Sequence, residues 1–72
     1  MRKYWYYTYK TANLFRCGVC YSDDGEFDIL GRMEYIGNKY SVDKGTVVID
    51  SWHEISSTQY EKLSKHFADR NK

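Results

Sequence analysis

The sequence has no proline, only two cysteines, and no stretch longer than six residues that is free of charge. A signal peptide needs an apolar region of about 7–15 residues, and a membrane helix needs about 20. Neither kind of segment is present. Two cysteines are also too few for the disulfide framework of a small secreted domain. The sequence therefore favours a protein of the reducing cytoplasm, with free thiols and no membrane partner.

A large excess of one charge is also missing, because 11 Lys+Arg stand against 10 Asp+Glu. The chain contains no linker and no internal repeat, which predicts a single domain, 1–72. A chain this short rarely supplies both a core and the deep pocket of a metabolic enzyme. It also contains no phosphate-binding loop and no cofactor fingerprint. We expect a non-enzymatic protein without catalytic residues, cofactor or metal.

Aromatic residues are abundant, with eight tyrosines, two tryptophans and three phenylalanines. Each buries roughly 150–250 Å², so a small core can be dense without staples. Residues 3–10 read as a strand, because tyrosine, tryptophan and threonine favour a pleated surface. Its rings alternate between two faces, so neither face is simply solvent-facing. A turn at 11–13 and a second strand at 14–22 predict an antiparallel hairpin.

The segment 27–40 fits two patterns. Apolar residues spaced as a helical stripe are Ile29, Met33, Ile36 and Tyr40. Strand alternation also fits part of the segment, interrupted by Gly31. Length and a cap-like Asp28 favour the helix, and Gly37-Asn38 is expected to end or fray it.

The last third of the chain predicts a strand at 46–49 and a helix that begins after Ser56, with Gln59 completing a capping box. A crossover through the first helix can place the third strand beside the first. The sequence therefore predicts an α+β fold, ββαβα, with a three-stranded sheet in the order 2-1-3. Both helices are expected to pack on one face and to leave the other uncovered.

Several segments resemble small uncharacterised bacterial and phage-borne α+β proteins with an aromatic N-terminal strand. The segments that carry the resemblance are Tyr4-Trp5-Tyr6-Tyr7, Phe27-Asp28-Ile29, Val47-Val48-Ile49 with Trp52, and Ile55-Ser56 with Tyr60. The resemblance spans most of the chain and implies a compact α+β fold. It implies no activity.

Cys17 and Cys20 have the spacing of a redox pair or of half a zinc site. Zinc would need two further ligands, for which only His53 and His66 are obvious. In a strand, this odd spacing puts the two thiols on opposite faces, where one metal cannot bind both without a bulge at Gly18. We therefore interpret them as one buried, inert side chain and one thiol on the other face, with metal binding left as an alternative.

Two further groups of polar residues have side chains that could carry chemistry. His53, between Asp50 and Glu54, could do acid–base chemistry, but no nucleophile or cofactor motif accompanies it. We interpret this segment as a connector between strand and helix. The acidic residues of 23–28 do not have the spacing of an EF-hand loop, and they predict a surface turn instead of a calcium site.

The aromatic first strand carries the functional hypothesis. Tyrosine and tryptophan are enriched at protein interfaces. The candidate interaction surface consists of Tyr4, Trp5, Tyr6, Tyr7, Tyr9 and Arg16. We expect a module that binds a protein partner or forms a homodimer through this surface. The alternative is a single-stranded nucleic-acid-binding protein, because rings stack on bases and the first twenty residues hold four cations and no acid.

Overall fold

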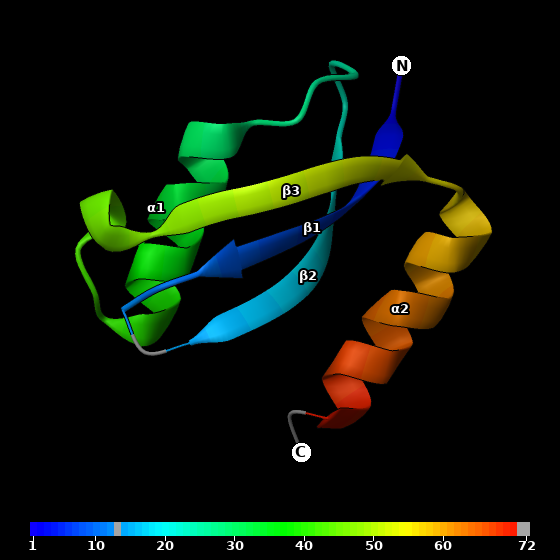
Figure 1. The fold of residues 1–72 in the computed structure, drawn as a ribbon. Helices are drawn as coiled ribbons and strands as arrows, with labels where there is room; N and C mark the ends of the chain where they lie inside the picture. The colour runs from blue at the N-terminus through cyan, green and yellow to red at the C-terminus, as the bar shows by residue number, and fades with distance from the viewer. Residues whose placement is uncertain (13, 71–72) are drawn as a thin grey trace.

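The computed structural model describes residues 1–12 and 14–70 (Figure 1). Two strands are followed by a helix, a short 3-10 turn, a third strand and a second helix. Their bounds are β1 Lys3–Lys10, β2 Phe15–Ser22, α1 Ile29–Tyr40, η1 Lys44–Thr46, β3 Val48–Ile55 and α2 Ser57–Arg70.

The sheet has the order β2-β1-β3, and β1 pairs antiparallel with both neighbours. This confirms the α+β class and the strand order predicted from sequence. β1 and β2 pair in register over their full length, from Lys3 opposite Ser22 to Lys10 opposite Phe15. The pairing of β1 with β3 shifts register between Thr8 and Tyr9, which is a β-bulge or similar irregularity. β2 and β3 are therefore the two edges of the sheet.

The alternation of β1 gives the sheet two distinct faces. The side chains of Trp5, Tyr7 and Tyr9 lie on the face that α1 covers, called the α1 face. Tyr7 and Tyr9 form the buried core there with Ile36 and Val47. Phe27, just before α1, contacts both Trp5 and Tyr7 through its ring. Figure 1 shows α1 behind the sheet, across β1 and β3.

The opposite face carries Tyr4, Tyr6 and Thr8 and is called the α2 face. Tyr60 of α2 lies on it, with ring centroids 4.8 Å from Tyr4 and 6.2 Å from Tyr21. The expectation that both helices pack on one face is therefore wrong. Rings on both sides of β1 need cover on both sides, because each exposed ring would leave a large apolar area in water. The two helices provide this cover, α1 on one face and α2 on the other.

The start of α1 is as predicted, because the Asp28 carboxylate accepts a hydrogen bond from the Gly31 N–H at 2.9 Å. Its end is not. The helix runs past Gly37 to Tyr40 and stops at Ser41, whose φ of 57° is left-handed. Gly37 is buried because the returning chain lies against it: a Cβ there would be 3.0 Å from the Val42 carbonyl oxygen. This glycine permits a close approach and does not end the helix.

β3 begins later than predicted and runs further, to Ile55. Thr46 belongs to η1, where its hydroxyl donates to the Asp43 carbonyl oxygen at 2.7 Å. The polar segment expected as a connector is therefore part of the strand, with Trp52 stacked on Phe27 at 5.3 Å. α2 begins as predicted, since the Gln59 N–H donates to the Ser56 hydroxyl at 3.1 Å. Neither helix, within the described residues, combines the length and apolar character needed to cross a membrane.

Candidate ligand groove beside strand β2

The structure separates the residues of the predicted interaction surface. Tyr7 and Tyr9 are 3% and 4% exposed, so they belong to the core and are not exposed rings of a surface as predicted. This corrects their assignment from sequence. Burial raises the pKa of both phenols, and the Arg32 guanidinium partly opposes this at Tyr7. Neutral, buried phenols are what a core of this kind requires.

The other predicted residues divide between the two faces. Trp5 is half-buried on the α1 face, and its indole Nε1 donates to the Ser22 hydroxyl at 3.1 Å. Tyr4 is half-buried against Tyr60. Tyr6 lies on the α2 face, where the neighbouring Cys17 thiol, together with burial, raises the pKa of its phenol. Five rings therefore do not make one surface.

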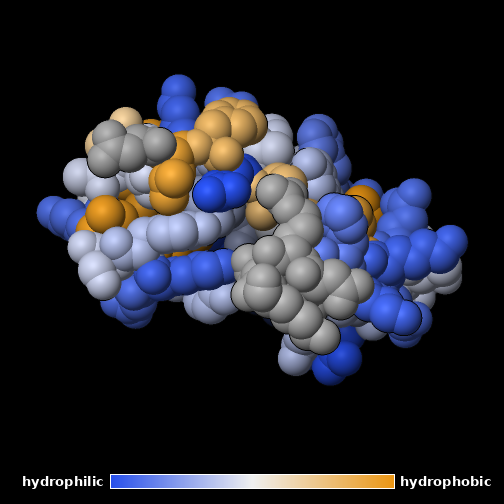
Figure 2. All heavy atoms as spheres, turned by 90° about the horizontal axis from the view of Figure 1, so that it is seen from below, coloured by the Kyte–Doolittle hydropathy of each residue, from blue (hydrophilic) through white to orange (hydrophobic). Residues whose placement is uncertain are grey.

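A hollow lies beside β2, and we call it the β2 groove. It has a volume of about 610 Å³. Its lining residues are Tyr7, Tyr9, Phe15, Arg16, Cys17, Gly18, Val19, Arg32, Tyr35, Lys39, Tyr40, Ser64 and Phe67. Figure 2 views the molecule from below Figure 1, the side of β2, and shows hydrophobic side chains next to strongly hydrophilic ones.

The shape of the groove floor depends on a glycine, Gly18. Gly18 lies directly opposite Tyr7 in the sheet. A Cβ at this position would be 3.0 Å from the Tyr7 hydroxyl oxygen, which is tighter than ordinary contact. Glycine therefore lets the Tyr7 ring lie across β2, and the groove remains open above it.

The charge of the lining is of one sign. Arg16, Arg32 and Lys39 are cationic, and the described lining holds no carboxylate. None of the three takes part in the three ion pairs found in the described residues. Arg32 lies over the Tyr35 ring at 4.9 Å, and Lys39 lies over the Tyr40 ring at 5.6 Å. These rings hold the cations in place without neutralising them.

Only Arg16 of the predicted surface contributes an exposed side chain to the groove. Sequence reasoning missed Arg32, Tyr35 and Lys39 of α1 and Phe67 of α2. Their helical spacing was visible, since positions 32, 35 and 39 share one side of a helix. What the sequence lacked was any sign that this side faces β2.

Cys17 and Cys20 lie opposite Thr8 and Trp5 respectively, and hence on opposite faces, as predicted. Both are free thiols. Cys20 packs against the core, and burial raises the pKa of its thiol. Cys17 lines the groove. The described residues contain no cluster of three potential metal ligands.

The two other polar clusters are explained by local structure. His53 is opposite Tyr6 on the α2 face, whereas Glu54 is opposite Trp5 on the α1 face and pairs with Lys3 at 3.7 Å. Histidine and carboxylate therefore point apart. His53 is not among the residues that line the β2 groove.

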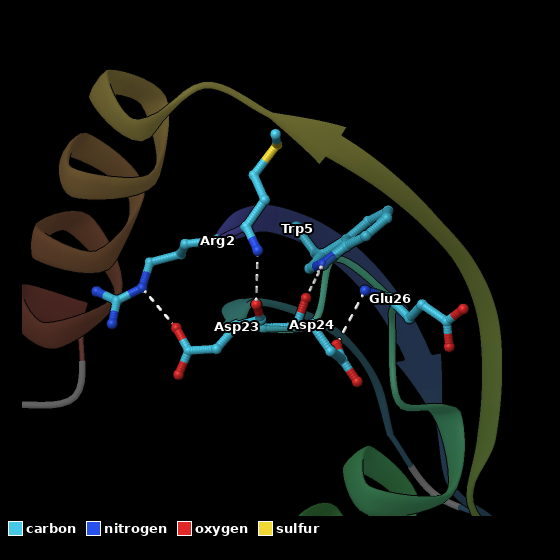
Figure 3. Close-up of polar contacts among 7 residues, drawn as sticks. Arg2, Trp5, Asp23, Asp24 and Glu26 are labelled. Atoms are coloured by element: carbon cyan, nitrogen blue, oxygen red, sulfur yellow. Dashed lines mark hydrogen bonds and ion pairs between the residues drawn. The ribbon is translucent and has the colours of Figure 1, made fainter.

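The acidic turn after β2 uses its carboxylates to shape the backbone (Figure 3). Asp23 pairs with Arg2 at 2.8 Å, and Asp24 accepts from the Glu26 N–H at 3.0 Å. Asp28 caps α1. These contacts agree with the surface turn predicted from sequence. The turn also places an acidic segment at the Ser22 end of β2, beyond the groove.

Comparisons with family models, with curated proteins and with solved structures found no match.

Proposed function

We propose that this protein is a non-enzymatic interaction module that binds an acidic segment of another protein in the β2 groove. The observation that carries the proposal is the sign of the lining: Arg16, Arg32 and Lys39 converge on one hollow without a carboxylate among the described lining residues. An overall charge of only +1 makes this local concentration more informative. Opposite charge on a partner would speed its encounter and fix its orientation.

The length of the groove suits a short peptide. Its β2 lining covers five consecutive residues, Phe15 to Val19. At about 3.4 Å per residue this is an edge of roughly 17 Å. Beyond it the chain continues into the acidic turn, whose carboxylates include Asp23 and Asp24. A short acidic segment can occupy the cationic groove without reaching the acidic turn. A long polyanion would extend beside that turn, where the charges repel.

The test is a binding titration with a capped peptide of alternating glutamate and valine, long enough to span β2. The intrinsic tryptophan fluorescence of the protein or calorimetry reports binding. We expect binding that weakens as salt rises, because the groove is open to solvent and its charges are screened. A peptide of alternating lysine and valine is the matched control and should not bind.

Charge reversal in the groove supplies the second arm. Arg32→Glu and Lys39→Glu should each lower the affinity for the peptide of alternating glutamate and valine (the Glu–Val peptide) by about tenfold, since like charges are then juxtaposed. Lys62→Glu makes the same change at an exposed position outside the lining and should leave affinity unchanged. Equal effects of Lys62→Glu and Arg32→Glu would overturn the proposal, as would binding of both peptides alike. Sedimentation in the absence of peptide tests whether the partner is instead a second copy of the chain.

Single-stranded nucleic acid is the second candidate. It is favoured by the exposed rings beside the cations, Phe15 at 65% and Tyr35 at 50% exposure. Such rings contribute about 1–3 kcal/mol per stacked base. Short oligothymidylate at low salt is the probe. Nucleic acid would be the better-supported ligand if oligothymidylate bound more tightly than the Glu–Val peptide and if Tyr35→Ala abolished that binding.

A further inference from the structure

The outer edge of β2 offers backbone hydrogen bonds that the sheet does not use. The Thr11 N–H donates to the Leu14 carbonyl oxygen at 2.9 Å, which fixes the phase of the antiparallel ladder. Hydrogen-bonded and non-hydrogen-bonded pairs alternate from this point along the hairpin. The β2 residues opposite Tyr9, Tyr7 and Trp5 therefore hydrogen-bond to β1 through their backbone. The β2 residues between them direct their backbone N–H and C=O groups outward. The outward-directed residues are Phe15, Cys17, Val19 and Tyr21.

Within the described residues, this edge has few of the features that usually protect one. β3 has the register shift beside Tyr9 and carries Asp50 and Glu54. β2 has eight uninterrupted pairs with β1, no proline and a single charged residue, Arg16. An unprotected edge is a template for another strand.

The two sides of this edge differ chemically. Arg16 lies on the α1 face, opposite Tyr9, and the α1 residues Arg32 and Lys39 line the same hollow. On the α2 face lie Phe15, Cys17 and Val19, with Phe67 of α2 lining the groove as well. A strand beside β2 would therefore meet cations with every second side chain and apolar groups with the side chains between them.

We propose that the β2 groove binds its partner by strand addition: an extended segment with alternating acidic and apolar side chains becomes a fourth strand on the outer edge of β2. The inference rests on the proposed function and adds the mode of recognition. Backbone pairing with the outward groups of Phe15, Cys17 and Val19 supplies affinity, and the two unlike sides select the alternating pattern.

A second copy of the chain is a poor occupant of this edge. A second β2 strand holds no acidic residue, so it offers no carboxylate to Arg16, Arg32 and Lys39. Single-stranded nucleic acid could meet the cations, but it has no N–H and C=O ladder to match the edge. An acidic peptide satisfies both the charge and the backbone.

Backbone methylation of the peptide tests the ladder directly. Two versions of the Glu–Val peptide are prepared, one with N-methyl groups on the valines and one with N-methyl groups on the glutamates. In an added strand only alternate residues turn their N–H groups toward β2. We therefore expect one series to lose at least about tenfold in affinity, roughly the effect of one hydrogen bond, and the other to bind like the parent. Equal affinities in both series, or equal losses, overturn strand addition.

Val19→Pro tests the same ladder from the protein side. Proline removes the outward N–H of an edge residue, a position where it is tolerated. Val19→Thr keeps the N–H and the branched shape and serves as the control. We expect Val19→Pro to lose binding about tenfold or more and Val19→Thr to retain it, with circular dichroism showing both folded. A folded Val19→Pro that binds normally overturns the inference. If this variant does not fold, the methylated peptides decide.

The failures of the two proposals are distinguishable. No binding of the unmodified Glu–Val peptide removes the proposed function itself. Binding that responds to Arg32→Glu but not to backbone methylation leaves an acidic-peptide groove without strand addition.

Discussion

The hydroxyl oxygens of Tyr9 and Tyr40 lie 3.1 Å apart and join the central strand to the last turn of α1. Tyr9 is 4% exposed, so its hydroxyl depends on this partner. The contact fixes the C-terminal end of α1 over the sheet, and with it the position of Lys39 at the groove. The pair therefore connects the stability of the core to the geometry of the candidate site.

Removal of either hydroxyl should destabilise the fold. We expect Tyr40→Phe to lower the free energy of unfolding by about 1–2 kcal/mol, because it leaves the buried Tyr9 hydroxyl unsatisfied. The double variant with Tyr9→Phe should cost less than the sum of the single changes. Urea denaturation measures all three, with Tyr35→Phe as an exposed control. Strictly additive losses would show that the two hydroxyls do not interact.

Alkaline pH should destabilise the protein. Burial raises the pKa of Tyr7 and of Tyr9 above the ordinary 10.0, so the folded state holds these protons more tightly than the unfolded chain. This contribution is complete below pH 10 and is lost as the pH rises above 10 toward the raised values of the folded state. We expect the free energy of unfolding to fall in that range, more steeply in the parent than in Tyr9→Phe. Urea unfolding at stepped pH, with tyrosinate absorbance, measures both. An unchanged slope in Tyr9→Phe would contradict this.

Two glycines of α1 should respond differently to alanine. At Gly37 the new Cβ would meet backbone atoms, the Val42 oxygen at 3.0 Å and the Lys44 Cα at 3.2 Å. We expect Gly37→Ala to cost about 1–3 kcal/mol, the usual cost of overpacking. At Gly31 the obstacle is the mobile Asp28 carboxylate. We expect Gly31→Ala to leave the free energy of unfolding nearly unchanged. The loss of the Asp28 cap, about 1 kcal/mol, is offset by a similar gain in helix propensity. Thermal unfolding compares the two, and equal costs would show that the Gly37 contact is not limiting.

Cys20 should be slow to react. Burial raises the pKa of its thiol, and the thiolate is the reactive form. In the Cys17→Ser variant we expect iodoacetamide to modify Cys20 far more slowly in the native protein than in urea. Mass spectrometry follows the reaction. Metal analysis of the purified parent tests the zinc alternative, and bound zinc that survives chelation would contradict the separation of Cys17 and Cys20 on opposite faces.

Local patterns predicted much of the fold, because their physical causes are local. The strand at 3–10, the cap at Asp28 and the start of α2 after Ser56 depend on alternation and on a side chain bonding nearby backbone. The length of β3 was missed because its second half mixes polar and apolar residues without regular alternation, and only the continuous apolar part was interpreted as a strand.

The candidate site was less predictable because it depends on how elements meet. Arg16 was identified, but Arg32 and Phe67 reach the same hollow from helices on opposite faces of the sheet. The side that each helix covers follows from the packing of Phe27 and Tyr60 against β1. No spacing within either helix specifies that choice.

The central strand precedes both of its partners in the chain, which has a consequence during synthesis. β2 can pair as soon as the hairpin is complete, but β3 follows only after α1. Domains fold as the chain emerges from the ribosome. We therefore expect the hairpin to form before β3 is available, with one edge of β1 unpaired and the Tyr7 and Tyr9 rings uncovered. A chain whose segment from Val48 onward has not yet left the ribosome would therefore expose this unpaired edge to aggregation and to capture by chaperones.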